Sequence, residues 1–133
     1  MIKEILTWVY LINFVFLMMH ETDASYWKEW RFFGKWGESL SDKQGLSIFI
    51  LARIPICIPL LYGLLNLNQL SGLIISTILS SFLIFHFCIH MVARKQGRSE
   101  FQWPISYFIQ FGMLIISTIQ LFITIQILIT TNV

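Results

Sequence analysis

The chain has 133 residues, of which 56% are hydrophobic and 12% are charged, about half the charged fraction of an ordinary soluble domain. This composition excludes a typical soluble fold, because a domain of this size could not bury so much apolar surface. The formal net charge of +2, from 9 Lys and Arg residues against 7 Asp and Glu residues, is too balanced for a nucleic-acid-binding surface. We therefore expect an integral membrane protein with no nucleic-acid partner.

The first predicted element is an apolar helix over about residues 5–20. A charged start before an apolar run is typical of a signal peptide, but no small-residue cleavage site follows, so we expect an uncleaved transmembrane helix. No Pro or Gly occurs before Gly34, and the helix is therefore expected to continue into an amphipathic, aromatic-rich segment over residues 21–33. Gly34, Gly37 and Gly45 then predict a turn region in which the chain folds back.

Three further apolar stretches are long enough to cross a membrane, since a hydrocarbon core of about 30 Å needs roughly 20 helical residues. The second predicted span covers about residues 46–67 and is expected to kink at Pro55 and Pro59, because each proline removes a helical hydrogen bond. The third covers about residues 70–92 and carries serines that allow neighbouring helices to approach closely. The fourth covers about residues 104–130 and begins with a proline, which suits a helix start.

Together these elements predict an all-α fold, a four-transmembrane-helix bundle that forms a single integral membrane domain over residues 1–133. Lysines and arginines gather in the first and third loops, at Lys28, Arg31, Lys35, Lys43, Arg94, Lys95 and Arg98. By the positive-inside rule, both termini are expected outside and the charged loops in the cytoplasm. We expect a bacterial inner membrane as the location, because the sequence carries no organelle signal.

The ionisable residues nearest the membrane interior gather at one depth. At about 1.5 Å per residue from the outer surface, His20 lies roughly 25 Å down, and His86 and His90 lie roughly 24 and 30 Å down. His86 and His90 are four residues apart and project from one helix face, and His20 and Asp23 share a face of the first helix in the same way. Three imidazoles from two helices are therefore expected to meet at the cytoplasmic end of the bundle.

His20, Asp23, His86 and His90 form the predicted metal-ligand set, because imidazole and carboxylate groups at these spacings bind Zn²⁺ or an iron ion. Glu21 is the predicted catalytic residue, which would polarise a metal-bound water. The enzyme class expected from this set is a metal-dependent membrane hydrolase or, with iron, an oxidase that acts on a lipid-like substrate.

Three other charged residues are assigned supporting or alternative ligand roles, namely Glu29, Arg53 and Glu100. On an unbroken helix Glu29 would lie about 180° from His20, so only a bend between them would turn both inward. Arg53 is expected to neutralise Asp23 or Glu29, or to grip an anionic lipid headgroup or substrate with its fork of donors.

A second function class stays open beside the metal-dependent enzyme. In a non-enzymatic accessory or scaffold protein, the same polar residues would hold the helix ends together. Such a protein would form a homo-oligomer or bind a partner membrane protein, and membrane lipids are expected contacts in either case. A transporter or channel is less favoured, because the mid-membrane region lacks the acidic residue that ion coupling usually requires.

The polar positions also carry a resemblance to known proteins. They occur in His20-Glu21-Thr22-Asp23-Ala24, Glu29-Trp30-Arg31, Ala52-Arg53-Ile54-Pro55, His86 with His90, and Ser99-Glu100-Phe101 leading to Ser106. In these motifs nearly the whole chain resembles uncharacterised small four-helix membrane proteins with a His-Glu-x-Asp-Ala…Glu-Trp-Arg signature. It is also loosely similar to the HXXEE membrane proteins, although the paired Glu of that motif is absent. The resemblance implies the four-helix architecture and implies no activity, and histidine is common in that family where this chain has Arg53.

Overall fold

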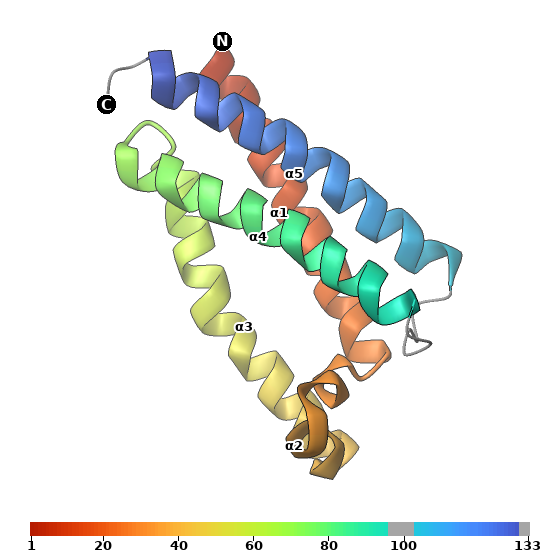
Figure 1. Ribbon diagram of the computed structural model, residues 1–133. Coiled ribbons are helices and arrows are strands. Elements are labelled where there is room, and N and C mark those ends of the chain that lie inside the picture. Colours follow the sequence, from red (N-terminus) through yellow and green to blue (C-terminus); the bar gives the residue numbers. More distant parts are fainter. Residues whose placement is uncertain (96–102, 131–133) are drawn as a thin grey trace.

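The fold is described by a computed structural model, in which residues 1–95 and 103–130 are placed. The described chain is all-α, and four of its helices are long and apolar enough to span a membrane. They are α1 (Ile2–Tyr26), α3 (Asp42–Leu65), α4 (Leu70–Lys95) and α5 (Pro104–Thr130), packed together as a bundle (Figure 1). The predicted fold class is confirmed.

The segment after α1 differs from the sequence-based expectation. The first helix continues past residue 20 but ends at Tyr26, and a 3-10 helix, η1 (Glu29–Phe33), and a short α-helix, α2 (Gly34–Ser39), follow it. Between α1 and η1, Lys28 adopts the left-handed conformation with a φ of 59°, which turns the chain. The first helix therefore extends into the aromatic-rich segment only as far as Tyr26, and the predicted turn region contains a helix of its own.

A capping box starts α3. The hydroxyl of Ser41 accepts a hydrogen bond from the Gln44 N–H at 3.3 Å, and the Gln44 side-chain oxygen accepts one from the Ser41 N–H at 3.1 Å. The helix then continues through both Pro55 and Pro59. It is the least buried of the four long helices, and it diverges from α4 toward α2 (Figure 1).

The core of the bundle forms where α5 packs against both α1 and α4, and where α3 packs against α4. It consists largely of leucine side chains with one tyrosine, one methionine and one isoleucine, namely Leu6, Tyr10, Leu17, Leu60, Leu67, Leu73, Leu79, Leu83, Met113 and Ile127. The outer faces of the helices carry many exposed isoleucine and phenylalanine side chains. An apolar exterior of this kind suits a hydrocarbon solvent and agrees with the four candidate spans.

Five fully buried polar side chains form a hydrogen-bond network inside this core. The side-chain amide of Asn13 in α1 donates to the side-chain oxygen of Gln120 in α5 at 2.7 Å. The Asn13 side-chain oxygen accepts from the hydroxyl of Ser117 at 3.1 Å. Gln120 donates to the Ser76 hydroxyl of α4 at 3.0 Å, and the Ser76 and Thr124 hydroxyls lie 2.9 Å apart. Because each bond joins different helices at fixed positions, the network sets the register of α1, α4 and α5.

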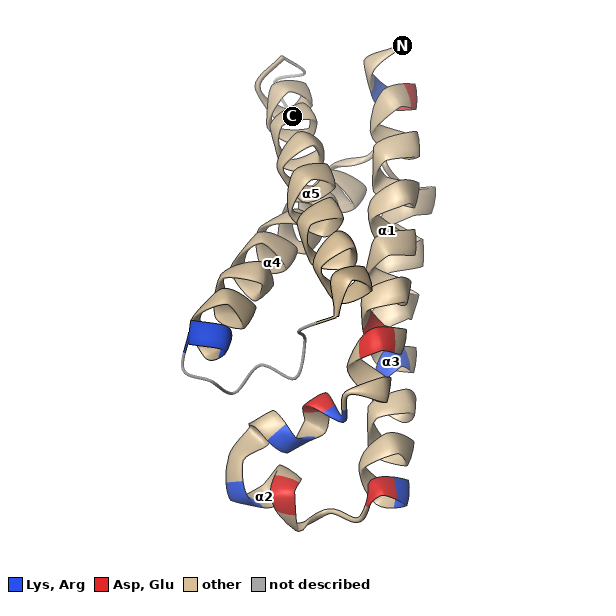
Figure 2. Cartoon of the chain, turned by 90° about the vertical axis from the view of Figure 1, so that its right-hand side faces the viewer, with Lys and Arg blue, Asp and Glu red and all other residues tan. Residues whose placement is uncertain are grey.

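Charged side chains gather at the end of the bundle that lies opposite the two termini. Figure 2 shows this distribution around η1, α2, the start of α3 and the end of α4, with one basic and one acidic position near the N-terminus. The four long helices therefore have one strongly charged end and one nearly uncharged end. Such a distribution is typical of membrane spans, whose charged flanks lie at the membrane surface.

The network predicts a specific loss of stability. In the variant Gln120→Leu, the Asn13 amide and the Ser76 hydroxyl lose their Gln120 partner, so the free energy of unfolding should fall by about 1–2 kcal/mol. Reversible unfolding in mixed micelles with increasing SDS measures the change. Gln126→Leu makes the same substitution at a half-buried position of α5 and serves as the control. Equal effects of the two variants would show that the network contributes nothing beyond packing.

Candidate metal centre

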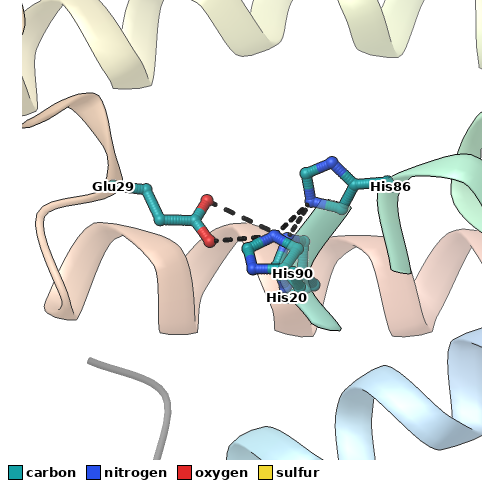
Figure 3. A group of neighbouring side chains, drawn as sticks. All are labelled: His20, Glu29, His86 and His90. Carbon is teal, nitrogen blue, oxygen red and sulfur yellow. Dashed lines mark hydrogen bonds and ion pairs between the residues drawn. The ribbon is translucent and has the colours of Figure 1, made fainter. Parts of the chain in front are cut away.

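Three imidazoles meet at the charged end of the bundle. His20 comes from α1, and His86 and His90 come from successive turns of α4. The Nε2 atom of His86 lies 2.8 Å from Nε2 of His20 and 2.8 Å from Nε2 of His90 (Figure 3). His20 and His90 are both buried. The spacing of four residues in α4 places His86 and His90 on one face. His20 reaches them from α1, because α1 and α4 both pack against α5.

Glu29 completes the group from η1. One of its carboxylate oxygens lies 3.2 Å from Nε2 of His90, and the other lies 4.0 Å from Nε2 of His20 (Figure 3). The bend that would turn both Glu29 and His20 inward is present, because α1 ends before Glu29 and the chain turns at Lys28. The four side chains each offer one ligand atom, and these atoms all lie within 4.8 Å of one another.

Contacts on both sides of Glu29 hold η1 against the start of α3. Lys28 and Arg31 form ion pairs with the two oxygens of Asp42, at 2.6 and 2.7 Å. The indole of Trp30 packs directly over Gly45, where an added Cβ would collide with the ring. These contacts fix the position of η1, and with it that of Glu29, relative to α3.

The electrostatic surroundings of Glu29 disfavour a bare negative charge. Burial, together with the nearby charges of Glu21 and Asp23, raises the pKa of the Glu29 carboxyl to about 8. A carboxylate in this position keeps a proton or takes up a positively charged partner. The group is thus suited to hold a cation beside three imidazole nitrogens.

Arg53 of α3 contacts Glu21 and Ser25 of α1 instead of pairing with Asp23 or Glu29. Its Nε lies 3.3 Å from a carboxylate oxygen of Glu21, and its Nη2 donates to the main-chain oxygen of Glu21 and to the hydroxyl of Ser25. Ser25 was not singled out in the sequence, since a lone serine carries no signal. The Glu21 carboxylate is thus engaged by Arg53, and Glu21 is not one of the four grouped residues.

The other predicted site residues lie apart from this group or outside the described residues. Asp23 is buried, and its Oδ2 atom has no hydrogen-bond partner among the described residues, but it is not one of the four grouped side chains. Glu100 lies outside the described residues. The structure thus brings His20, His86 and His90 together with Glu29, the acidic residue that sequence analysis had given only a supporting role.

The interatomic distances fit a first-row divalent ion. Four ligands arranged tetrahedrally at about 2.0–2.1 Å from Zn²⁺ lie roughly 3.3 Å from one another. The observed separations of 2.8, 3.2 and 4.0 Å between ligand atoms lie on both sides of that value. Small side-chain rotations would therefore bring the four ligand atoms into coordination positions without a change in the backbone.

The Arg53–Glu21 pair predicts a non-additive pattern of stability. The variant Arg53→Met leaves a partly buried carboxylate without its partner, so the free energy of unfolding should fall by about 1–3 kcal/mol. The double variant Arg53→Met/Glu21→Leu removes both charges and should recover at least half of that loss. SDS unfolding of Arg53→Met, Glu21→Leu and the double variant measures the coupling energy between the two side chains. Additive losses would contradict a direct ion pair.

The comparisons with known proteins give a family but no activity. Searches of curated proteins and of solved structures found no match. The model of a family of unknown function, DUF6713, matches residues 6–127, which is most of the chain and includes all four residues of the candidate metal centre. The chain therefore belongs to the DUF6713 family of unknown function.

Proposed function

We propose that this chain is an integral membrane metalloprotein, in which His20, Glu29, His86 and His90 bind one divalent cation at the cytoplasmic end of a single membrane domain. The ion would be Zn²⁺ or iron, and the centre would hydrolyse or oxidise a lipid-like substrate. The observation that carries the proposal is the convergence of three Nε2 atoms on one point, with a carboxylate beside them.

Hydrogen bonding alone accounts poorly for this convergence. A neutral imidazole Nε2 has either one proton or one lone pair, so it makes one strong hydrogen bond. His86 Nε2 nevertheless lies 2.8 Å from the Nε2 atoms of both His20 and His90. A cation that accepts a lone pair from each ring satisfies all three nitrogens at once.

The balance of charges around the four residues also supports a bound cation. Glu21, Asp23 and Glu29 carry three carboxylates close together at the charged end of α1, and Arg53 neutralises the one on Glu21. Two carboxylates remain, and both belong to buried side chains, which is costly without a compensating charge. One divalent cation would supply that compensation.

The ligand set also limits the chemistry. Three imidazoles and one carboxylate suit both Zn²⁺ and iron, and catalysis requires a further coordination position for water or substrate. Glu21 is less suited to accept a proton from a bound water than its sequence position suggested, because Arg53 holds its carboxylate. Lipid access is supported by the location of the group within helices whose outer faces are apolar.

Metal content tests the proposal. Protein purified in mild detergent without added chelator should contain about one zinc or iron ion per chain, and the variant His86→Ala/His90→Ala should contain less than about 0.2, because two of four ligands are lost. Inductively coupled plasma mass spectrometry measures both values. Wild-type protein with less than about 0.2 ion per chain, unchanged in the double variant, would favour the scaffold class instead.

A matched pair of glutamate variants controls this measurement. Glu29→Gln should weaken the affinity for Zn²⁺ at least about tenfold, because the amide is a poor ligand in place of a carboxylate. Glu38→Gln removes the same charge from an exposed position of α2 and should bind Zn²⁺ as the wild type does. Equal affinities of the two variants would exclude Glu29 from the centre.

The orientation of the chain is part of the proposal, with both termini outside and the charged end in the cytoplasm. It is supported by the lysines and arginines of η1, α2 and the end of α4, against Lys3 alone at the other end. In a background with Cys57 and Cys88 replaced by serine, Lys3→Cys should react with a membrane-impermeant maleimide in intact cells. Lys35→Cys should react only after permeabilisation. The opposite pattern would invert the orientation.

A further inference from the structure

One of the four proposed ligands lies on an open side of the candidate metal centre. Three of the ligands are buried, whereas His86 is half-buried. The ring of Phe82, one turn earlier in α4, stacks on the His86 ring with 5.6 Å between the centroids and an interplanar angle of 26°. Phe82 is itself 55% exposed. Figure 3 shows the His86 ring on the side of the group that faces α3, with α5 on the opposite side.

The same face of α4 packs against α3 farther from the charged end. Ile75 lies about two helical turns before Phe82 and about three before His86, so these three side chains form one stripe, the α4 stripe. At Ile75 the two helices are in close contact, since a Cβ added at Gly63 of α3 would lie 2.5 Å from the Ile75 side chain. The stripe that α3 covers at Ile75 is therefore exposed at Phe82.

Contacts with α1 hold α3 away from the rest of the α4 stripe. The hydroxyl of Tyr10 in α1 donates to the main-chain oxygen of Leu60 at 2.7 Å. Nearer the charged end, Arg53 pairs with Glu21 of α1. The helix α3 thus stays beside α1, and Figure 1 shows that it diverges from α4 on the way. This divergence explains why the aromatic ring over His86 is exposed.

We propose that a fatty acid or fatty acyl ester enters from the bilayer between α3 and α4, over Phe82. Its acyl chain lies along the α4 stripe, and its carbonyl oxygen binds the ion beside His86. Oxygen donors of this kind are ligands for both Zn²⁺ and iron. This inference deepens the proposed function, on which it rests, because it names the substrate class of the same centre and the route by which the substrate enters.

The direction of the α4 stripe matches that of a lipid in one leaflet. From His86 the stripe runs away from the charged end, through Phe82, toward Ile75. Acyl chains run in the same direction, from a head group at the membrane surface toward the bilayer centre. The stripe lies in a candidate membrane span and is apolar beyond His86, so hydrocarbon is its expected neighbour. A bound lipid would therefore bring the polar end of its chain to the ion without inverting in the membrane.

Access to a Co²⁺ ion tests the route in the full chain in detergent micelles. Co²⁺ bound in place of Zn²⁺ has visible absorption bands that change when another ligand binds the ion. The probe is octanohydroxamic acid, which carries an acyl chain on a metal-binding head group, and stopped-flow absorption measures its association rate. Phe82→Ala uncovers His86 and should raise this rate at least about fivefold. Phe82→Trp covers His86 with a larger ring and should lower it at least about fivefold.

Two controls isolate the route from other effects of the substitutions. Phe122→Ala removes a ring that is 65% exposed on α5 and should leave the association rate of octanohydroxamic acid unchanged. Acetohydroxamic acid has the same head group without the long chain, so it reports access from water, and its rate should be the same in the wild type and in every variant. Rates of octanohydroxamic acid that stay unchanged in both Phe82 variants would overturn the route. Rates of the two probes that change in parallel would also overturn it.

The same samples separate this inference from the proposed metal centre. Each variant should bind as much Co²⁺ as the wild type, since none of the substitutions replaces a proposed ligand. Wild-type protein that binds no Co²⁺ would overturn the metal centre and the route with it. Co²⁺ bound in every variant, with association rates that do not depend on Phe82, would overturn the route alone. Phe82→Trp retains an aromatic ring, so the test stands even where Phe82→Ala fails to fold.

Discussion

The absence of water from a bilayer interior is the constraint on which this structure depends. Every polar group carried into the span must find a partner inside the protein. Midway along the bundle, Asn13, Ser76, Ser117, Gln120 and Thr124 meet that requirement with one another. Their bonds cross between α1, α4 and α5, so satisfying them also fixes how the three helices are aligned. Leucine packing alone would leave that alignment free, because lipid chains are as apolar as leucine.

At the charged end the same constraint has a different outcome. Three imidazoles and a carboxylate lie together, and their donors and acceptors do not match one another as the amides and hydroxyls of the network do. The fixed register of α1 against α4 brings His20 to His86 and His90. The mid-bundle network therefore supports the candidate metal centre from a distance, since a slip of either helix would separate the imidazoles.

Glu29 connects this centre to the segment between the first two candidate spans. It belongs to η1, which is held by Asp42 and Gly45 of α3 and lies beside the short helix α2. Three proposed ligands thus come from long helices and one comes from the 3-10 helix between two of them. Arg53 adds a second tie between α1 and α3 at this end. The loosely packed α3 is thereby anchored to the site by two polar contacts, although little of its surface is buried.

Composition and pattern were sufficient to predict an all-α bundle of four spans, because apolar runs of this length have one stable form in a bilayer. Spacing was sufficient to place the three histidines at one depth, because helical rise is constant. The position of Glu29 could not be predicted in this way. It depends on the left-handed turn at Lys28, and no Gly or Pro marks that turn in the sequence. The partner of Arg53 also depended on which face of α3 packs against α1. Local sequence determined the helices and their depth, whereas contacts between distant segments decided which acidic side chain reached the imidazoles.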